Sequence, residues 1–274
     1  MTLERGERGS GAGVRMLGGP MRKTFVAAGF ISLALATGAR AETPAFAPGR
    51  PGATETAVSV PRGMLQIETE IAGYTLDRAG GVETQAHSFA ATTFRFGVAH
   101  GADVELIVSP YRRERATGAD TAEGFGDVTL RARRTFLGED GGASVGVIGY
   151  VTLPTAGEGL GARDVEGGVI ATGAFDLNSK LSLAWTAGVG AVSTDDDGYD
   201  TDTSGALTLG ASLTDRWAAY VEVGADHVDD TAVFYGAGMT YLLATTTQLD
   251  IGFDAGATDA ADDLNVFVGW AHRF

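Results

Sequence analysis

Residues Asp263 to Phe274 read Asp-Leu-Asn-Val-Phe-Val-Gly-Trp-Ala-His-Arg-Phe, and the rest of the chain is interpreted from this stretch. Alternate positions form two sets, one mostly apolar or aromatic and the other mostly small or polar. The apolar set is Leu264, Val266, Val268, Trp270, His272 and Phe274. A β-strand points successive side chains to opposite faces, so this stretch predicts a strand with one apolar face.

The composition restricts the class of protein. The chain has 274 residues, no Cys and a formal charge of −15. Without cysteine it cannot be stapled by disulfides. Residues 1–41 contain 6 basic and 2 acidic residues, so the remainder carries 14 basic and 33 acidic residues, a net charge of −19. Such a surface repels phosphate backbones, and we expect no nucleic acid partner.

The N-terminal region predicts an export signal. An apolar block, residues 24–36, follows Arg22 and Lys23 and precedes Ala39-Arg40-Ala41. A basic flank, a short apolar region and an A-x-A site are typical of a secretory signal, here cleaved near Ala41. Met21 is then the expected start, and residues 1–20 an upstream extension. A buried N-terminal helix is the alternative. After residue 41 no apolar run is long enough for a membrane-spanning helix.

From Met64 onward, about ten alternating residues and a turn form a unit that repeats along the chain. Short connections alternate with longer ones, and twelve strands are predicted. They are 64–76, 87–98, 102–112, 126–137, 143–153, 166–177, 180–192, 204–213, 216–225, 232–243, 247–256 and 263–274. This pattern predicts an all-β fold, a twelve-stranded antiparallel up-and-down transmembrane β-barrel of the bacterial outer membrane. A soluble β-sandwich is the alternative.

Two further segments are interpreted from the barrel. Residues 42–62 contain four prolines and lack periodicity, which predicts a flexible periplasmic lead-in or a segment that tucks into a barrel mouth. The chain thus divides into 1–41, 42–62 and a barrel at 63–274. The final strand resembles the C-terminal signature of outer-membrane barrels, which the barrel-assembly machinery reads. Trp270 and Phe274 are therefore the predicted assembly signal.

The polar set of alternate positions predicts the lumen. In the first four strands it carries charges, and buried charges need partners, so we expect a paired network. The predicted network is Glu68, Glu70, Arg95, Asp103, Glu105, Asp127, Arg131 and Arg133. The later strands carry a predicted small-residue wall at Gly188, Gly210, Gly224, Gly236, Gly238, Gly252 and Gly269. These glycines either permit barrel curvature or leave a narrow conduit, and both interpretations stay open.

Charge also separates the two ends of the barrel. The six longer connections with their flanks sum to −15, so most of the excess negative charge lies at the outer rim. The basic cluster at this rim is Arg112, Arg113 and Arg115, which is suited to contact lipid phosphates or to pair with nearby acids. Outer-membrane lipid and lipopolysaccharide are therefore expected partners.

Several short stretches occur in an order that resembles a known family. They are Val60–Glu68, Phe96–Val98, Ala102–Leu106, Gly124–Val128, Leu153–Thr155, Arg216–Glu222, Gln248–Asp250 and His272–Phe274. The chain resembles the outer-membrane transporters named for the MetA-pathway of phenol degradation. The resemblance covers nearly all of the chain after residue 41, although Ala156 stands where the family often has glycine. It implies a porin-like barrel of Gram-negative bacteria for passive uptake of small hydrophobic or aromatic solutes, without identifying a substrate.

Two other functions are considered. An outer-rim hydrolase would use His227 beside Asp226, Asp229 and Asp230, but no further partner is specified. We therefore expect no enzyme, no catalytic residue and no cofactor. The acidic run 195–202 lacks the ligand spacing of a calcium loop, so no metal site is predicted, although weak divalent bridging to lipopolysaccharide stays open. A structural or adhesive barrel without a conduit is the other alternative.

Overall fold

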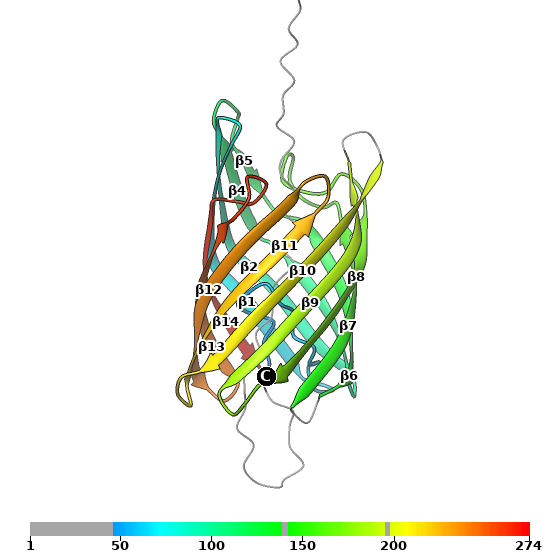
Figure 1. Ribbon diagram of the computed structural model, residues 1–274. Helices are drawn as coiled ribbons and strands as arrows, with labels where there is room; N and C mark the ends of the chain where they lie inside the picture. The colour runs from blue at the N-terminus through cyan, green and yellow to red at the C-terminus, as the bar shows by residue number, and fades with distance from the viewer. Residues whose placement is uncertain (1–45, 139–141, 195–197) are drawn as a thin grey trace, which may run out of the picture.

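The computed structural model describes residues 46–138, 142–194 and 198–274, which form one closed barrel (Figure 1). The strands are tilted around the barrel axis, with the C-terminus and short turns at one end and the longer loops at the other. The predicted signal segment, residues 1–41, lies outside the described residues. Asp195, Asp196 and Asp197 of the acidic run lie outside them too.

Fourteen strands are present in the described part of the chain. They are β1 (Leu65–Ala79), β2 (Val82–Ala99), β3 (Ala102–Val108), β4 (Tyr111–Ala116), β5 (Ala122–Gly124), β6 (Val128–Leu137), β7 (Ala143–Leu153), β8 (Glu166–Asp176), β9 (Leu181–Ser193), β10 (Tyr199–Ser212), β11 (Trp217–His227), β12 (Thr231–Ala244), β13 (Thr247–Gly256) and β14 (Leu264–Arg273). Both β3 and β4 pair with β2, and β5 pairs with β4 as β6 pairs with β3. These four stretches therefore act as two interrupted strands, and the barrel has the predicted twelve.

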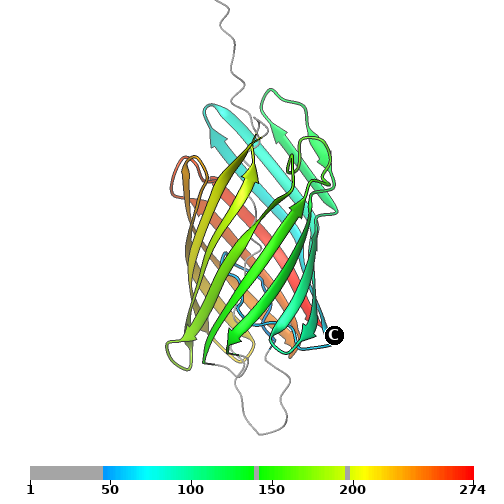
Figure 2. The ribbon, with the colours of Figure 1, turned by 90° about the vertical axis from the view of Figure 1, so that its right-hand side faces the viewer.

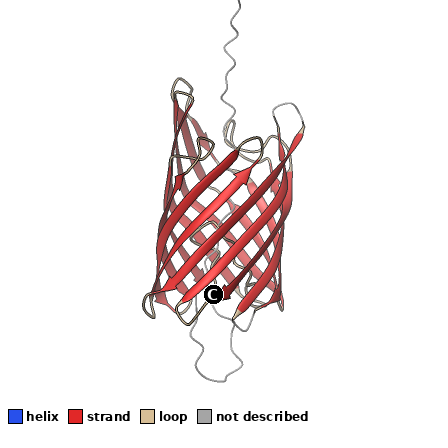
Figure 3. Ribbon diagram, viewed as in Figure 1, coloured by secondary structure: helices blue, strands red, loops and turns tan. Residues whose placement is uncertain are grey.

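The barrel is closed by pairing between the first and last strands. β1 pairs antiparallel with β14 on one side and with β2 on the other, and β14 also pairs with β13. The first and last strands therefore leave no open edge in the sheet. Closure satisfies the backbone hydrogen bonds that lipid cannot satisfy. The regular elements of the described residues are strands joined by loops (Figure 3). No helix among these residues is long and apolar enough to span a membrane.

The outer surface of the barrel is apolar. In β13, the side chains of Leu249, Ile251 and Phe253 are exposed, whereas those of Gln248 and Asp250, at the alternate positions, are buried inside. The same alternation recurs around the barrel and leaves many large apolar side chains facing outward. An apolar band of this extent belongs against lipid rather than water. The predicted orientation, with a polar lumen and an apolar outside, therefore agrees with the structure.

Aromatic side chains gather at the short-turn end. The rings of Trp217 and Tyr241 lie 4.6 Å apart on neighbouring strands. Along β14, the Trp270 ring is stacked with that of His272 at 5.9 Å, and His272 meets Phe274 edge-on at 4.4 Å. These rings form part of an interfacial girdle, where amphipathic aromatic groups are favoured.

The strands differ from the predicted ranges mainly at the loop end. β2 begins at Val82 rather than 87, and β10 begins at Tyr199 rather than 204. Beyond the lipid both faces meet water, so the alternation of apolar residues fades while backbone pairing continues. The predicted strand 102–112 is interrupted between β3 and β4 at Pro110, which has no N–H to donate to the ladder.

Candidate functional site

A stretch of chain lies inside the barrel near the short-turn end, and we call residues 46–62 the inner segment (Figure 2). Thr54, Thr56 and Ala57 are at most 1% exposed. The expected flexible periplasmic lead-in is therefore wrong for these residues, and the alternative of a segment tucked into the barrel is the one observed. The segment is held because side chains of the wall satisfy its backbone groups, as the following contacts show.

The first half of the inner segment is bound to β13 and β11. Arg50 forms an ion pair with Asp250 at 3.3 Å, and its carbonyl oxygen accepts a hydrogen bond from the Gln248 amide at 3.0 Å. Farther along, the backbone N–H of Ala53 donates to Glu222 at 2.6 Å. Polar side chains projecting inward from these strands thus replace the strand partners that the segment lacks.

The second half crosses a row of buried threonines, one on each of four strands. The row is Thr208 of β10, Thr186 of β9, Thr172 of β8 and Thr135 of β6. Thr54 lies 3.0 Å from Thr208 between hydroxyl oxygens. The N–H groups of Glu55 and Ser59 donate to Thr186 and Thr135 at 2.8 and 3.0 Å. Threonine suits this task because one hydroxyl can both donate and accept.

The inner segment then returns to the wall at β2 and β3. The N–H of Val60 donates to Asp103 at 2.7 Å, and that of Gly63 donates to the Gly97 carbonyl at 2.7 Å. A Cβ on Gly97 would clash with the Pro61 carbonyl, so this close approach requires glycine. The chain enters β1 directly afterwards. The segment has by then contacted strands around most of the inner circumference.

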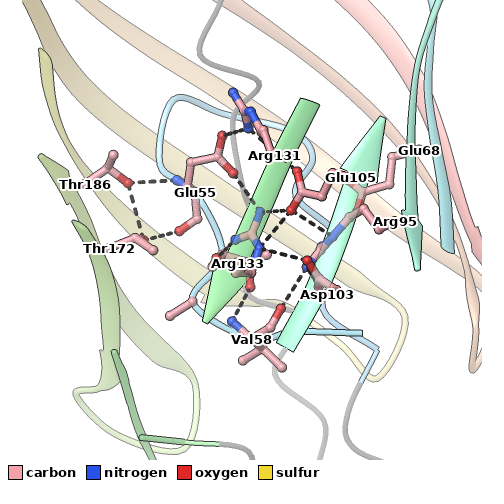
Figure 4. Close-up of polar contacts among 12 residues, drawn as sticks. Glu55, Val58, Glu68, Arg95, Asp103, Glu105, Arg131, Arg133, Thr172 and Thr186 are labelled. Carbon is pink, nitrogen blue, oxygen red and sulfur yellow. Dashed lines mark hydrogen bonds and ion pairs between the residues drawn. The ribbon is translucent and has the colours of Figure 1, made fainter. Parts of the chain in front are cut away.

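A buried ion network fixes the inner segment to the wall formed by β1, β2, β3 and β6 (Figure 4). Arg95 pairs with Glu68 at 3.0 Å and with Asp103 at 2.9 Å. Arg133 pairs with Glu105 at 2.7 Å and with Glu55 at 3.3 Å. The guanidinium of Arg133 also donates to the Thr56 carbonyl. Arg131 pairs with Glu55 at 2.7 Å.

This network combines three arginines with four carboxylates, those of Glu55, Glu68, Asp103 and Glu105. Its side chains are no more than 5% exposed. Removing such charges from water is costly, and the cost is offset only when each charge keeps its partners. The arrangement therefore depends on the inner segment, because Glu55 supplies one of the four anions.

Two predicted members lie elsewhere. Glu70 accepts a hydrogen bond from Ser88 and lies 3.9 Å from Arg50, so it contacts the inner segment apart from the network. Asp127 lies at the loop end, where its carboxylate accepts hydrogen bonds from the N–H groups of Thr155, Ala156 and Ala162. Including Asp127 in the charge network was wrong: Asp127 lies in the interruption between β5 and β6, and its carboxylate binds the backbone of a loop.

The predicted glycine wall faces inward but is not open. A Cβ on Gly238 or Gly252 would meet Tyr220, a Cβ on Gly224 would meet the Phe234 ring, and Phe267 also lies over Gly252. The other positions are similarly approached: Gly188 by Ser204, Gly236 by Asp254 and Gly269 by Arg50, while Gly210 is buried on β10. The space over most of these glycines is therefore filled by neighbouring side chains. The glycines make room for larger inward side chains.

Sequence reasoning missed the residues that the inner segment contributes and contacts. Arg50 and Glu55 sit in a stretch without periodicity, and their partners are 200 and 76 positions away. The threonine row carried a weak signal, since inward positions of β8, β9 and β10, and of β6 beyond β7, repeat one residue type. A local pattern does not reveal that a separate segment lies against them.

Solved structures of outer-membrane barrels have a similar fold. The fold is similar to an outer membrane channel from Pseudomonas putida F1, with 12% identity, 80% of this chain and 98% of that chain covered, and a TM-score of 0.63. It is also similar to the NanC porin, with 8% identity, coverage of 76% and 98%, and a TM-score of 0.50. No curated protein matches the sequence.

The described barrel therefore has the fold of outer-membrane channels and porins. A family model described as "Putative MetA-pathway of phenol degradation" matches residues 48–274, and the chain belongs to this family. The match begins inside the inner segment rather than at β1, so it covers most of that segment as well as the barrel wall.

Proposed function

We propose that the protein is a passive outer-membrane channel for small hydrophobic or aromatic solutes, closed at its short-turn end by the inner segment. The observation that carries this proposal is that the segment occupies the lumen without joining the sheet. Residues 46–60 make ion pairs and side-chain hydrogen bonds to the wall, and neither a backbone ladder nor a disulfide fixes them there. Contacts of this kind can be exchanged without unfolding the barrel.

Passage requires the inner segment to shift. The segment and the wall side chains beneath it are buried together, including Gln66, Gln248 and Thr172. A solute that enters from the loop end therefore meets a closed layer. Displacing residues 46–54 breaks the wall contacts of Arg50, Ala53 and Thr54 but leaves the ion network of Glu55 in place. The wall of β11–β14 is consequently the proposed side of passage.

Aromatic side chains on that wall support the proposed solute class. Tyr220, Phe234 and Phe267 point inward over the glycines, and the Phe267 ring lies 5.8 Å from the Arg50 guanidinium. Ring faces pack well against aromatic or apolar solutes. The family's association with phenol degradation is consistent with this chemistry.

The alternative function, a hydrolase at the outer rim, would use the imidazole of His227 as its base. This imidazole lies 3.0 Å from the Thr231 hydroxyl at the rim.

Solute uptake into proteoliposomes tests the proposal. Phenyl glucoside and methyl glucoside share a sugar, differ by a ring and cross lipid slowly, so their rates compare aromatic with non-aromatic passage. We expect uptake of both above protein-free liposomes, with the phenyl compound favoured. Phe234→Ala with Phe267→Ala should remove the preference, whereas Phe253→Ala on the outer face should keep it. Uptake no faster than through lipid alone would favour a structural barrel.

A further inference from the structure

The outward face of β2 and β4 carries a group of nitrogen-rich side chains beyond the apolar band. The strands pair Phe89 with Tyr111, then His87 with Arg113, then Gln85 with Arg115. Ser88 lies between His87 and Phe89 on β2, and its hydroxyl donates to Glu70 inside the barrel. The side chains of His87 and Phe89 therefore point outward. Figure 1 places β4 and β5 at the raised edge of the barrel, at the end opposite the C-terminus.

The level of this group relative to the membrane follows from the strand geometry. Phe89 and Tyr111 are exposed on the outer face with ring centroids 6.0 Å apart, as expected of an outer aromatic girdle at the headgroup level. Each further pair on the same face lies about 7 Å along the strands. Measured along the tilted strands, His87 and Arg113 therefore lie about 7 Å past the aromatic pair and Gln85 and Arg115 about 14 Å past it, on the loop side of the girdle.

The side chains line a shared hollow. A surface pocket of ≈ 130 Å³ is bounded by Gln85, His87, Arg113 and Arg115. Two guanidinium groups, an imidazole and an amide offer several N–H donors to one anion. Guanidinium groups bind phosphate by paired, charge-assisted hydrogen bonds, which are stronger than bonds between neutral groups.

The neighbouring carboxylates compensate only part of this positive charge. Glu83 is bound by Arg78 at 2.9 Å and by the Gln85 amide at 2.7 Å. Glu123 accepts a hydrogen bond from Tyr111 at 3.1 Å and lies 3.9 Å from the Arg113 guanidinium. Among the described residues, no carboxylate lies within ion-pairing distance of Arg115. The pocket thus stays cationic on a chain of strongly negative charge.

We infer that this pocket binds a phosphate group of a lipopolysaccharide molecule in the outer leaflet. The lipid is favoured over a dissolved anion because the pocket opens outward and adjoins the apolar surface at Phe89 and Tyr111, where acyl chains pack. The lumen and inner segment lie on the other face, so the inference stands independently of the proposed channel. It also differs from divalent bridging, which would use the acidic loops.

Lipid retention in nanodiscs tests the site. Full-length protein is reconstituted with phosphatidylcholine and a small fraction of lipopolysaccharide, in EDTA to remove divalent bridges, and bound lipid is counted by native mass spectrometry. The test variant carries Arg113→Gln and Arg115→Gln. The control carries Arg134→Gln, which removes an exposed arginine near the short turns, where it donates to the His100 carbonyl. Heat-modifiable gel mobility checks that all three proteins are folded.

We expect the wild type and control to retain lipopolysaccharide and the double variant to bind it at least about tenfold more weakly, as expected for loss of charge-assisted hydrogen bonds. Dephosphorylated lipopolysaccharide should bind the wild type as weakly as the intact lipid binds the variant. Equal retention by folded wild type and double variant would overturn the site. Inorganic phosphate that binds as tightly as the lipid would overturn the assignment to a lipid, and loss of wild-type binding in EDTA would indicate divalent bridging instead.

Discussion

Glu55 connects the inner segment to the barrel more extensively than its position in an aperiodic stretch suggests. Its carboxylate pairs with Arg131 and Arg133, its N–H donates to Thr186, and its carbonyl accepts from Thr172. Without this carboxylate, the nearest remaining anion to Arg131 is Glu105 at 3.9 Å. A buried guanidinium would then lack a close partner, a strongly unfavourable state.

Glu55→Gln should therefore destabilise the folded barrel by about 3–5 kcal/mol, the cost of breaking a buried ion pair. The free energy of unfolding, from urea titration of protein folded in lipid vesicles, measures the effect. Glu158→Gln, at an exposed position of a loop, should change it by less than about 0.5 kcal/mol. Equal stability of the two variants would mean that water reaches Arg131 and screens its charge.

Gly238 leaves room for the Tyr220 ring because it has no side chain. A Cβ there would clash with the Tyr220 ring, whereas a Cβ on Gly149 of β7 meets nothing within 4 Å. Gly238→Ala should lower the free energy of unfolding by about 1–3 kcal/mol through overpacking. Gly149→Ala is the matched control and should be neutral or slightly stabilising, since alanine loses less backbone entropy than glycine. If Gly238→Ala is also neutral, Tyr220 does not occupy the space over the glycine.

At the scale of elements, the strands were predictable, whereas the inner segment was foreseen only as an alternative and its contacts were not. β7 and β13 have the predicted bounds because lipid on one side and a polar lumen on the other impose strict alternation. Asp127 was misplaced because pairing is interrupted beside it, so its alternation no longer reports a lumen position. The path of residues 46–62 depends on partners far away in sequence, and no local periodicity encodes it.

The last strand has its own prediction. Phe274 lies at the end of β14, its N–H donates to the Leu65 carbonyl at 2.8 Å, and its ring meets His272 at the predicted lipid interface. We propose that Phe274 is also read by the barrel-assembly machinery. Phe274→Asp should lower the yield of the heat-modifiable folded form in the outer membrane severalfold, and Phe274→Tyr should keep it. Equal folded yields for both variants would contradict a role of this ring in assembly.

At the scale of the molecule, the lumen has two unlike walls with the inner segment between them. The wall of β2, β3 and β6 holds buried arginines and carboxylates, which resist rearrangement because any separated charge is costly. The wall of β11–β14 holds aromatic rings over glycines and contacts the segment at fewer charged positions. In the proposed channel, the first wall is therefore rigid, and the segment yields to a solute along the second.

A reversible crosslink between the inner segment and the wall tests this account most directly. The hydroxyl oxygens of Thr54 and Thr208 lie 3.0 Å apart, and the chain has no native cysteine to interfere. Thr54→Cys with Thr208→Cys can therefore be oxidised to lock the segment and reduced to release it. The control pair is Thr129→Cys with Thr152→Cys, which joins β6 to β7 and leaves the segment free. The hydroxyl oxygens of Thr129 and Thr152 lie 2.9 Å apart.

The measurement is phenyl glucoside uptake by proteoliposomes of each pair before and after reduction. Oxidation of the Thr54–Thr208 pair should lower uptake severalfold, reductant should restore it, and the control pair should transport equally in both states. Uptake through the locked protein at the rate of the reduced protein would contradict the claim that the inner segment must shift for a solute to pass.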